Sequence, residues 1–204
     1  MATKRPAATR EAPDVRRQAL IDATAACLAE RGAAGTSVRT ICQRAGVSPG
    51  LLRHYFDGID ALIAETYRAT AARVSATLGA AAADAGADPR ARLIAFITAS
   101  FRPPVSDASL LATWLAFWSL VKTDPAIAAI HAETYRDNRA ALESLLAGHG
   151  LPAARVRPVA IALTALVDGL WLERSLDPAS FTPEEAGAMA VRWLDTLLER
   201  PGFD

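Results

Sequence analysis

The sequence is poor in the residues that build metal sites and disulfide frameworks. Its 204 residues include two cysteines and three histidines. Cys27 and Cys42 both fall in helical apolar patterns, so we expect buried free thiols, and the histidines show no ligand spacing with each other or with the cysteines. The sequence therefore predicts no disulfide, no metal and no cofactor.

Long apolar runs are also missing. No stretch approaches the roughly 18 uninterrupted apolar residues of a membrane span. The opening MATKRPAATREAPD lacks the apolar segment of a signal peptide. We therefore expect a cytoplasmic protein with no membrane partner. The hydrophobic content of 51% is still enough for a substantial core.

Recognisable catalytic patterns and alternating strand patterns are equally scarce. No nucleophile, metal-ligand or phosphate-loop spacing is present, which argues against an enzyme, although a small helical enzyme stays as an alternative. Helix signals are frequent instead. A capping residue followed by proline recurs at Ser48-Pro49, Asp88-Pro89, Asp124-Pro125 and Thr182-Pro183.

Apolar residues recur at helical spacing between these start signals. Glu185 follows Thr182 by three residues, which is the spacing of a capping box. The sequence thus predicts an all-α fold of nine helices, near residues 14–31, 37–45, 48–55, 59–84, 89–101, 107–122, 125–147, 156–175 and 183–199.

Charge is distributed unevenly along a chain whose net charge is zero. Residues 1–56 hold nine Lys and Arg against four acids, whereas the remainder holds 13 against 18. A basic first part on an acidic second part indicates that one end meets a polyanion.

Residues 37–56 have the pattern of a helix-turn-helix. Val38, Ile41 and Cys42 form a buried edge on the first helix, with Arg39 and Arg44 outside it. Gly46 can adopt the positive φ that ends a helix, and Ser48 then caps the next one.

The second helix of this pair has two unlike faces. At 100° per residue, Leu52 and Phe56 lie inward with Tyr55 beside them, whereas Gly50, Arg53 and His54 point outward. An apolar anchor opposite a cationic face suits a helix pressed into DNA. A helical corner of a protein that does not bind DNA can show the same turn, so the turn alone leaves both interpretations open.

These residues also carry a resemblance to a known family. The run RRQALIDATAACLAERGAAGTSVRTICQRAGVSPGLLRHYFDGIDALIAETY, with its specific core AGVSPGLLRHYF, resembles the TetR family of bacterial transcription regulators. WLAFWSLVKTDPAI and ALVDGLWLERSL resemble more weakly the branch that contains BetI, a choline-responsive regulator. The resemblance implies a basic tail at 1–13, a DNA-binding head at 14–58 and a ligand-binding, dimerising body at 59–204.

It further implies a homodimer, in which two heads bind successive major grooves of a palindromic double-stranded DNA operator. The DNA-contacting residues carried over by position, together with the outward Arg44, are Ser37, Arg39, Arg44, Ser48, Pro49, Gly50, Arg53, His54 and Tyr55. Arg53 is the best candidate for a base edge. Ile59 stands where relatives commonly have a phosphate-binding lysine. Arg16, Arg17 or the tail residues Lys4, Arg5 and Arg10 are the hypothesised replacements.

The body carries an aromatic stripe. Trp114, Phe117 and Trp118 lie at i, i+3 and i+4 and share one helical face. Such a stripe is most often core, whereas the functional alternative is that these rings, with Trp171 and the carboxylate of Asp168, hold a cation. The resemblance favours a choline-like small-molecule effector.

The helix near 156–175 is apolar on more than one face, as expected of a dimer interface or of a central core helix. With the last helix it resembles the family's dimerisation pair, and the predicted interface residues are Leu163, Leu166, Leu170, Trp193 and Leu197. The resemblance implies a repressor that releases DNA when the effector binds. An architectural DNA-binding protein without an effector is the alternative.

Overall fold

The computed structural model describes residues 13–199, which form nine helices and no strands. The predicted all-α fold is confirmed, with boundaries close to the expected ones. The predicted basic tail, including Lys4, Arg5 and Arg10, lies outside the described residues, apart from position 13, where α1 begins. The helices are α1 (Pro13–Arg31), α2 (Val38–Ala45), α3 (Pro49–Tyr55), α4 (Gly58–Asp84), α5 (Pro89–Ala99), α6 (Ala108–Val121), α7 (Pro125–Gly148), α8 (Ala153–Leu176) and α9 (Pro183–Glu199).

Side-chain caps begin the helices where the sequence predicts them. Asp88 accepts hydrogen bonds from the first backbone N–H groups of α5, and Asp124 does the same for α7. Thr182 and Glu185 form the reciprocal capping box of α9, at 2.7 and 3.1 Å. These bonds satisfy N–H groups that have no partner within the helix.

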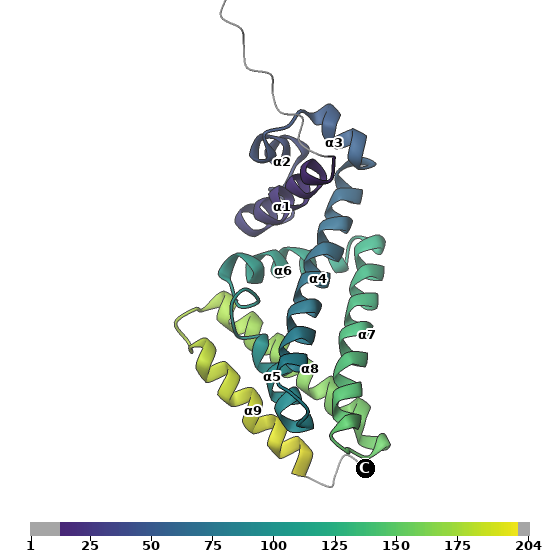
Figure 1. The fold of residues 1–204 in the computed structure, drawn as a ribbon. Coiled ribbons are helices and arrows are strands. Elements are labelled where there is room, and N and C mark those ends of the chain that lie inside the picture. The colour runs from purple at the N-terminus through teal and green to yellow at the C-terminus, as the bar shows by residue number, and fades with distance from the viewer. Residues whose placement is uncertain (1–12, 200–204) are drawn as a thin grey trace, which may run out of the picture.

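Two hydrophobic clusters organise the described chain. The head cluster joins α1, α2 and α3 around residues such as Leu20, Ile41 and Leu52, and the body cluster lies among α4 to α9. Helix α4 enters both, because Leu62 belongs to the head cluster and Tyr67 to the body cluster. Figure 1 shows α4 leaving the head and running through the body beside α7.

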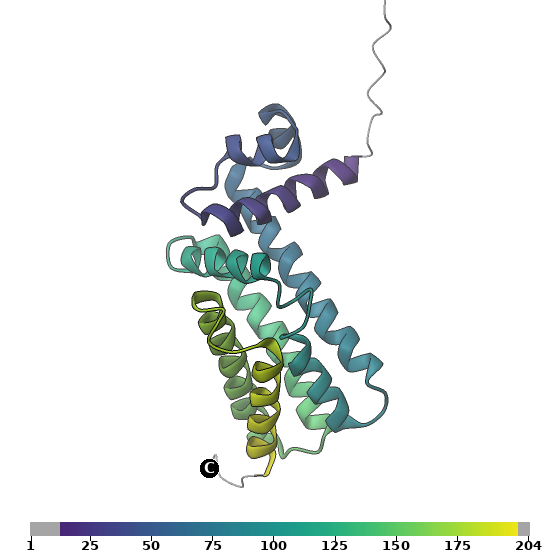
Figure 2. The ribbon, with the colours of Figure 1, turned by 90° about the vertical axis from the view of Figure 1, so that its left-hand side faces the viewer.

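Helix α6 lies across the body directly beneath α1, as both views show (Figures 1 and 2). Leu28 of α1 packs into the body cluster, and the Thr113 hydroxyl of α6 donates to the Ala25 carbonyl of α1 at 3.2 Å. The head therefore rests on the body through two helices, α4 and α6.

Helices α8 and α9 form one side of the body and are held by a few polar contacts. Arg155 at the start of α8 donates to the carbonyl of Leu197 at the end of α9, at 2.5 Å. Arg90 of α5 pairs with Asp195 of α9 at 2.6 Å. No helix within residues 13–199 has both the length and the apolar character needed to cross a membrane.

We expect Leu52→Ala to destabilise the head by about 2 to 5 kcal/mol, because Leu52 is fully buried between the head helices and its truncation leaves a cavity. Urea unfolding followed by circular dichroism measures the change. The matched control is the neighbouring Arg53→Ala, an exposed position where the change should stay within about 0.5 kcal/mol. Equal stabilities for the two variants would contradict the packing described for α3.

Candidate functional site

The first candidate site is the outer face of α3. Leu52 and Phe56 are buried in the head cluster, Tyr55 is half-buried beside them, and Arg53 and His54 are exposed. The two faces inferred from helical periodicity are therefore the two faces of the folded helix.

No contact within the protein requires a glycine at position 50. A Cβ there would meet only the Ser48 hydroxyl, at 3.8 Å, and its backbone is not in the left-handed region. A larger side chain would fit the protein itself without a clash. The missing side chain leaves room for something outside the chain to approach the backbone of α3.

The α2–α3 corner is built as the sequence predicts. Ser37 caps α2 in a reciprocal pair with Thr40, and Gly46 ends that helix with φ +65°. Ser48 caps α3 by accepting the Leu51 N–H at 3.3 Å. Arg39 and Pro49 are exposed on the same corner. The hydroxyls of Ser37 and Ser48 are thus already used in holding the helices.

Two arginines near this surface brace the head. Arg44 donates to both carboxylate oxygens of Glu30, which ties α2 to α1. Arg17 donates to Glu65 at 2.7 Å and lies 5.2 Å from the centre of the Phe56 ring. To reach a phosphate, either side chain would first have to leave its carboxylate.

Ile59 packs against both the head and the body cluster. A lysine side chain could not fill this half-buried position equally well, because its ammonium group would need water. The apolar residue therefore strengthens the junction between head and body at the place where relatives of the resembled family commonly have a lysine.

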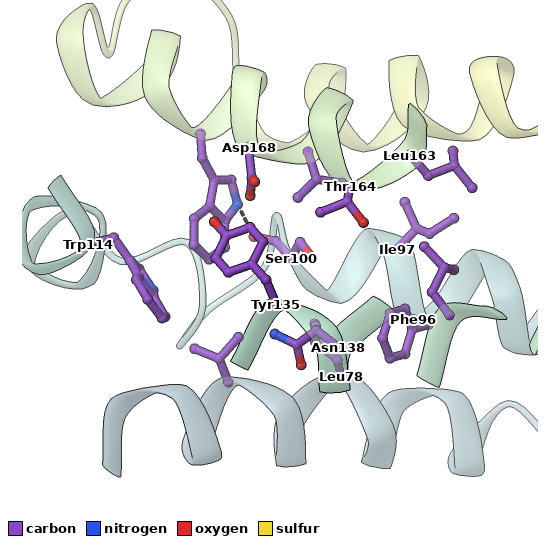
Figure 3. Close-up of a pocket in the computed structure, with 14 residues that line it drawn as sticks. Leu78, Phe96, Ile97, Ser100, Trp114, Tyr135, Asn138, Leu163, Thr164 and Asp168 are labelled. Carbon is purple, nitrogen blue, oxygen red and sulfur yellow. Dashed lines mark hydrogen bonds between the residues drawn. The ribbon is translucent and has the colours of Figure 1, made fainter. Parts of the chain in front are cut away.

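The second candidate site is a cavity inside the body, of about 90 Å³. Figure 3 shows its lining, with polar groups of Asp168, Tyr135 and Asn138 beside Trp114, and Phe96, Ile97 and Leu163 toward the other side of the view. A more open pocket of about 360 Å³ lies on the other side of Tyr135 and Asp168, which line both spaces. The lining comes from α4, α5, α6, α7 and α8.

The structure divides the predicted aromatic cage. Trp114, Trp171 and Asp168 line the inner cavity, whereas Trp118 lines the outer pocket. Phe117 is 0% exposed and lines neither, so it is a core residue. Trp114 lies next to both other rings, with centres 5.8 Å from Phe117 and 6.5 Å from Trp118, but the three do not line one common space.

Asp168 is the most perturbed carboxylate of the site. Burial raises its pKa from 3.8 to about 6, against a smaller opposing effect of a hydrogen bond from Tyr135 and the charge of Arg139. Among residues 13–199, no basic side chain forms an ion pair with it. The ligand-free protein thus bears the free-energy cost of a partly desolvated carboxylate that no ion pair neutralises within residues 13–199.

Sequence reasoning missed the polar residues of α7 and α4 that surround Asp168. The hydroxyl of Tyr67 lies 3.0 Å from Nδ1 of His131, and the rings of His131 and Tyr135 stack with centres 4.2 Å apart. Asn138 accepts a hydrogen bond from Ser75 at 2.6 Å. The four-residue spacing of His131 and Tyr135 on one helix was the available signal. Within residues 13–199, no group of three or more potential ligands could hold a metal ion.

The predicted dimer residues fall into two groups. Leu163 is 0% exposed and Leu197 8%, so both pack inside the chain's own core and leave almost no surface for a partner. Leu166 and Leu170 are half-buried, and Trp193 is 54% exposed. An amphipathic helix does not reveal by periodicity alone which apolar face meets its own core and which stays outside.

Known proteins match this chain over most of its length. Residues 20–66 match the bacterial regulatory proteins of the tetR family, and residues 89–199 match the C-terminal region of BetI-type transcriptional repressors. The HTH-type transcriptional regulator BetI of Burkholderia thailandensis is 37% identical over 91% of this chain and 94% of its own.

Solved structures agree with these matches. A transcriptional regulator from Pseudomonas aeruginosa PAO1 has 44% identity and a TM-score of 0.85, covering 92% of each chain. A regulator from Saccharomonospora viridis, solved in complex with choline, shares the fold with a TM-score of 0.79 at 16% identity, covering 89% of this chain and 96% of its own.

A basic helix-turn-helix head joined to an all-helical body defines a DNA-binding transcription regulator. The chain belongs to the TetR family, and its body is of the BetI type. The relatives are transcription regulators and not enzymes, so the chain is a regulator and the alternative of a small helical enzyme falls away.

We expect Asp168→Asn to raise the stability of the ligand-free protein at pH 7 by about 1 to 3 kcal/mol. Because the folded-state pKa is raised, the stability linked to this proton is present below about pH 4 and is lost as pH rises through about 6. The gain should therefore shrink as pH falls from 6 to 4. Thermal unfolding of both proteins across this range measures it.

The groups facing Asp168 are Tyr135 and Arg139 from α7 and, at longer range, Tyr67 from α4. Burial raises the pKa of Tyr135 and of Tyr67, so both stay neutral across that range. His131 lines the outer pocket with Asp168, and burial lowers its pKa, but it is present in both proteins, so the difference between them reports Asp168. Asp137→Asn, an exposed position on α7, is the control and should leave stability nearly unchanged. A gain that does not depend on pH would contradict the assignment.

Proposed function

We propose that this regulator is a repressor that binds a palindromic operator as a homodimer and is released by a small cationic effector bound in the body. The DNA-binding unit is residues 14–58, and residues 59–204 bind the effector and dimerise. The single observation that carries the effector proposal is the half-buried Asp168 carboxylate on the wall of a cavity, which no basic side chain of residues 13–199 pairs with.

The head supplies the DNA contacts through the exposed face of α3 and the start of α2. Arg53 is the base-reading residue, since an arginine reaching a guanine edge is the commonest specific contact. His54 and Arg39 bind phosphate, and Gly50 allows the backbone of α3 to approach the groove. These groups are positioned by Ser37, Ser48, Pro49 and Tyr55. Arg44 contributes a further contact once its side chain has left Glu30.

The effector cavity is lined in part by α4, the helix that joins the body to the head. A line of contacts leads from Asp168 to α4. Asp168 lies beside Tyr135, and the Tyr135 ring packs against His131. The His131 ring is in hydrogen-bond contact with the Tyr67 hydroxyl on α4. A cation at Asp168 changes the charge that these three side chains face. The choline bound by the Saccharomonospora viridis regulator supports a cation as the effector here.

The junction between head and body can accommodate movement. Alanines 25, 26 and 29 of α1 face α4 and α6 across a cavity of about 490 Å³. Small side chains and incomplete packing let α1 shift without breaking a dense core. Such a shift changes the distance between the two heads, so that effector and operator weaken each other's binding reciprocally.

An apolar face on α8 and α9 supports the homodimer. Ile161, Leu172 and Leu176 are exposed along one side of α8, and Trp193 is exposed on α9. Gly169 lies on the same side of α8, where a Cβ would meet nothing in the chain, so a partner helix can approach closely. A two-fold dimer supplies two recognition helices roughly 34 Å apart.

We expect the protein to shift the mobility of DNA from upstream of its own gene, and choline or a related cation to reverse the shift. Arg53→Ala should weaken specific binding by about 1 to 3 kcal/mol, because a base-edge contact is lost. Titrated gel shifts at fixed salt measure both effects. Arg136→Ala, an exposed arginine of the body, is the matched control.

Unchanged operator affinity in Arg53→Ala would remove that residue from base reading. DNA binding that no effector candidate reverses would favour the architectural alternative.

We expect Trp193→Asp combined with Ile161→Asp to convert the dimer into a folded monomer, because two charges would replace exposed apolar contacts at the interface. Sedimentation velocity measures the mass, and circular dichroism checks the fold. Val15→Asp is the control, since Val15 is similarly exposed at 53% but lies on α1. A dimer that survives the double substitution would place the interface elsewhere.

A further inference from the structure

The Asp168 carboxylate offers hydrogen-bond acceptor sites to a ligand in addition to charge. An ionised carboxylate has about four lone-pair sites. The Tyr135 hydroxyl is a protein donor beside it that lowers its pKa, and no Lys, Arg or His of residues 13–199 forms an ion pair with it. A ligand that brings N–H donors would satisfy lone pairs that a bare charge leaves empty.

The same cavity contains donors in need of an acceptor. Trp114 is 5% exposed, and its Nε1 has no hydrogen-bond partner among the described residues. Asn138 uses its oxygen to accept from Ser75, which leaves its amide N–H groups available. Figure 3 shows the amide nitrogen of Asn138 pointing toward the side of the view where Tyr135 and Trp114 lie. These donors suit an oxygen atom on the ligand.

The aromatic rings are arranged for packing rather than for enclosing a quaternary ammonium. The Trp114 ring has its centre 5.3 Å from that of Tyr67, 5.8 Å from that of Phe117 and 6.5 Å from that of Trp171. Rings at these separations contact each other. A trimethylammonium group binds best against several open ring faces, and here the Trp114 ring is contacted by the rings of Tyr67, Phe117, Trp118 and Trp171.

We propose that the effector is a small protonated amine that keeps at least one N–H and carries an oxygen acceptor, an amino alcohol in its simplest form. This inference rests on the proposed function, since it specifies the ligand of the same cavity. An N–H donor to a carboxylate is a charge-assisted bond, stronger than a neutral one and unavailable to a quaternary ammonium. The cavity of about 90 Å³ limits the ligand to a few heavy atoms.

The test is a graded series in which each step replaces one N–H by an N-methyl group: ethanolamine, N-methylethanolamine, N,N-dimethylethanolamine and choline. Each methyl also enlarges the ligand, so an even loss at every step reports size, whereas a drop confined to the last step reports the loss of the last N–H. Titration calorimetry on the full-length protein at pH 7.5 measures each affinity. We expect the largest drop, at least about tenfold, between the dimethyl compound and choline, where the last N–H disappears. Choline binding as tightly as the dimethyl compound, or more tightly, overturns the inference.

Two variants separate the contacts. Asp168→Asn should flatten the series, because the charge-assisted bond is lost for every amine. Trp114→Phe keeps a ring but removes the unpaired N–H. It should weaken ethanolamine by severalfold while leaving ethylamine, which has no oxygen, nearly unchanged. An equal loss for both amines would contradict the acceptor part of the inference.

Operator release is measured in parallel by gel shift with the same compounds. Amines that bind the protein and cause it to release the operator support both proposals. Release by choline alone overturns the inference and leaves the proposed function standing. Amines that bind in the predicted order without releasing the operator support the inference about the cavity and contradict the proposed regulation. An absence of binding by every compound overturns the inference.

Discussion

The structure depends on the sharing of α4 between two hydrophobic clusters. Leu62 packs in the head, and five residues later Tyr67 packs in the body, so a displacement of this helix is felt on both sides. Leu28 makes a second link, because it belongs to α1 and yet lies in the body cluster. Dense packing transmits small shifts, whereas the alanine-lined space between α1 and α6 leaves the head room to respond. In the regulation proposed above, this shared packing is what links the operator to the effector.

The body contains a conflict between stability and binding. A half-buried carboxylate with a raised pKa destabilises the ligand-free fold at neutral pH, and an apolar or amide side chain at position 168 would relieve that cost. Residues that are unfavourable for folding often mark binding sites. The unpaired N–H of Trp114 in the same cavity belongs to the same pattern, because one ligand can satisfy both groups.

Sequence reasoning succeeded where local rules apply and failed where neighbouring helices decide. Ser48 and Asp88 were predicted as caps, and both accept backbone N–H groups at helix starts. The outward direction of Arg53 also followed from periodicity. Phe117 shared a predicted cage with Trp114 and is instead core, and Leu163 was placed at a dimer surface but is fully buried. Helical spacing tells which residues share a face, and it does not tell what that face meets.

The sequence by itself determined the nine helices and the helix-turn-helix, because capping, proline and glycine positions and 3.6-residue periodicity act within a few residues of one another. The family followed from the resemblance of one specific run of residues. Only the tertiary structure decided that Asp168 meets Tyr135 and lines a cavity with Asn138, and that Arg44 is held by Glu30. These groups lie far apart in the chain, and their contacts depend on how whole helices pack. Burial and pairing are properties of that packing, so no local pattern could reveal them.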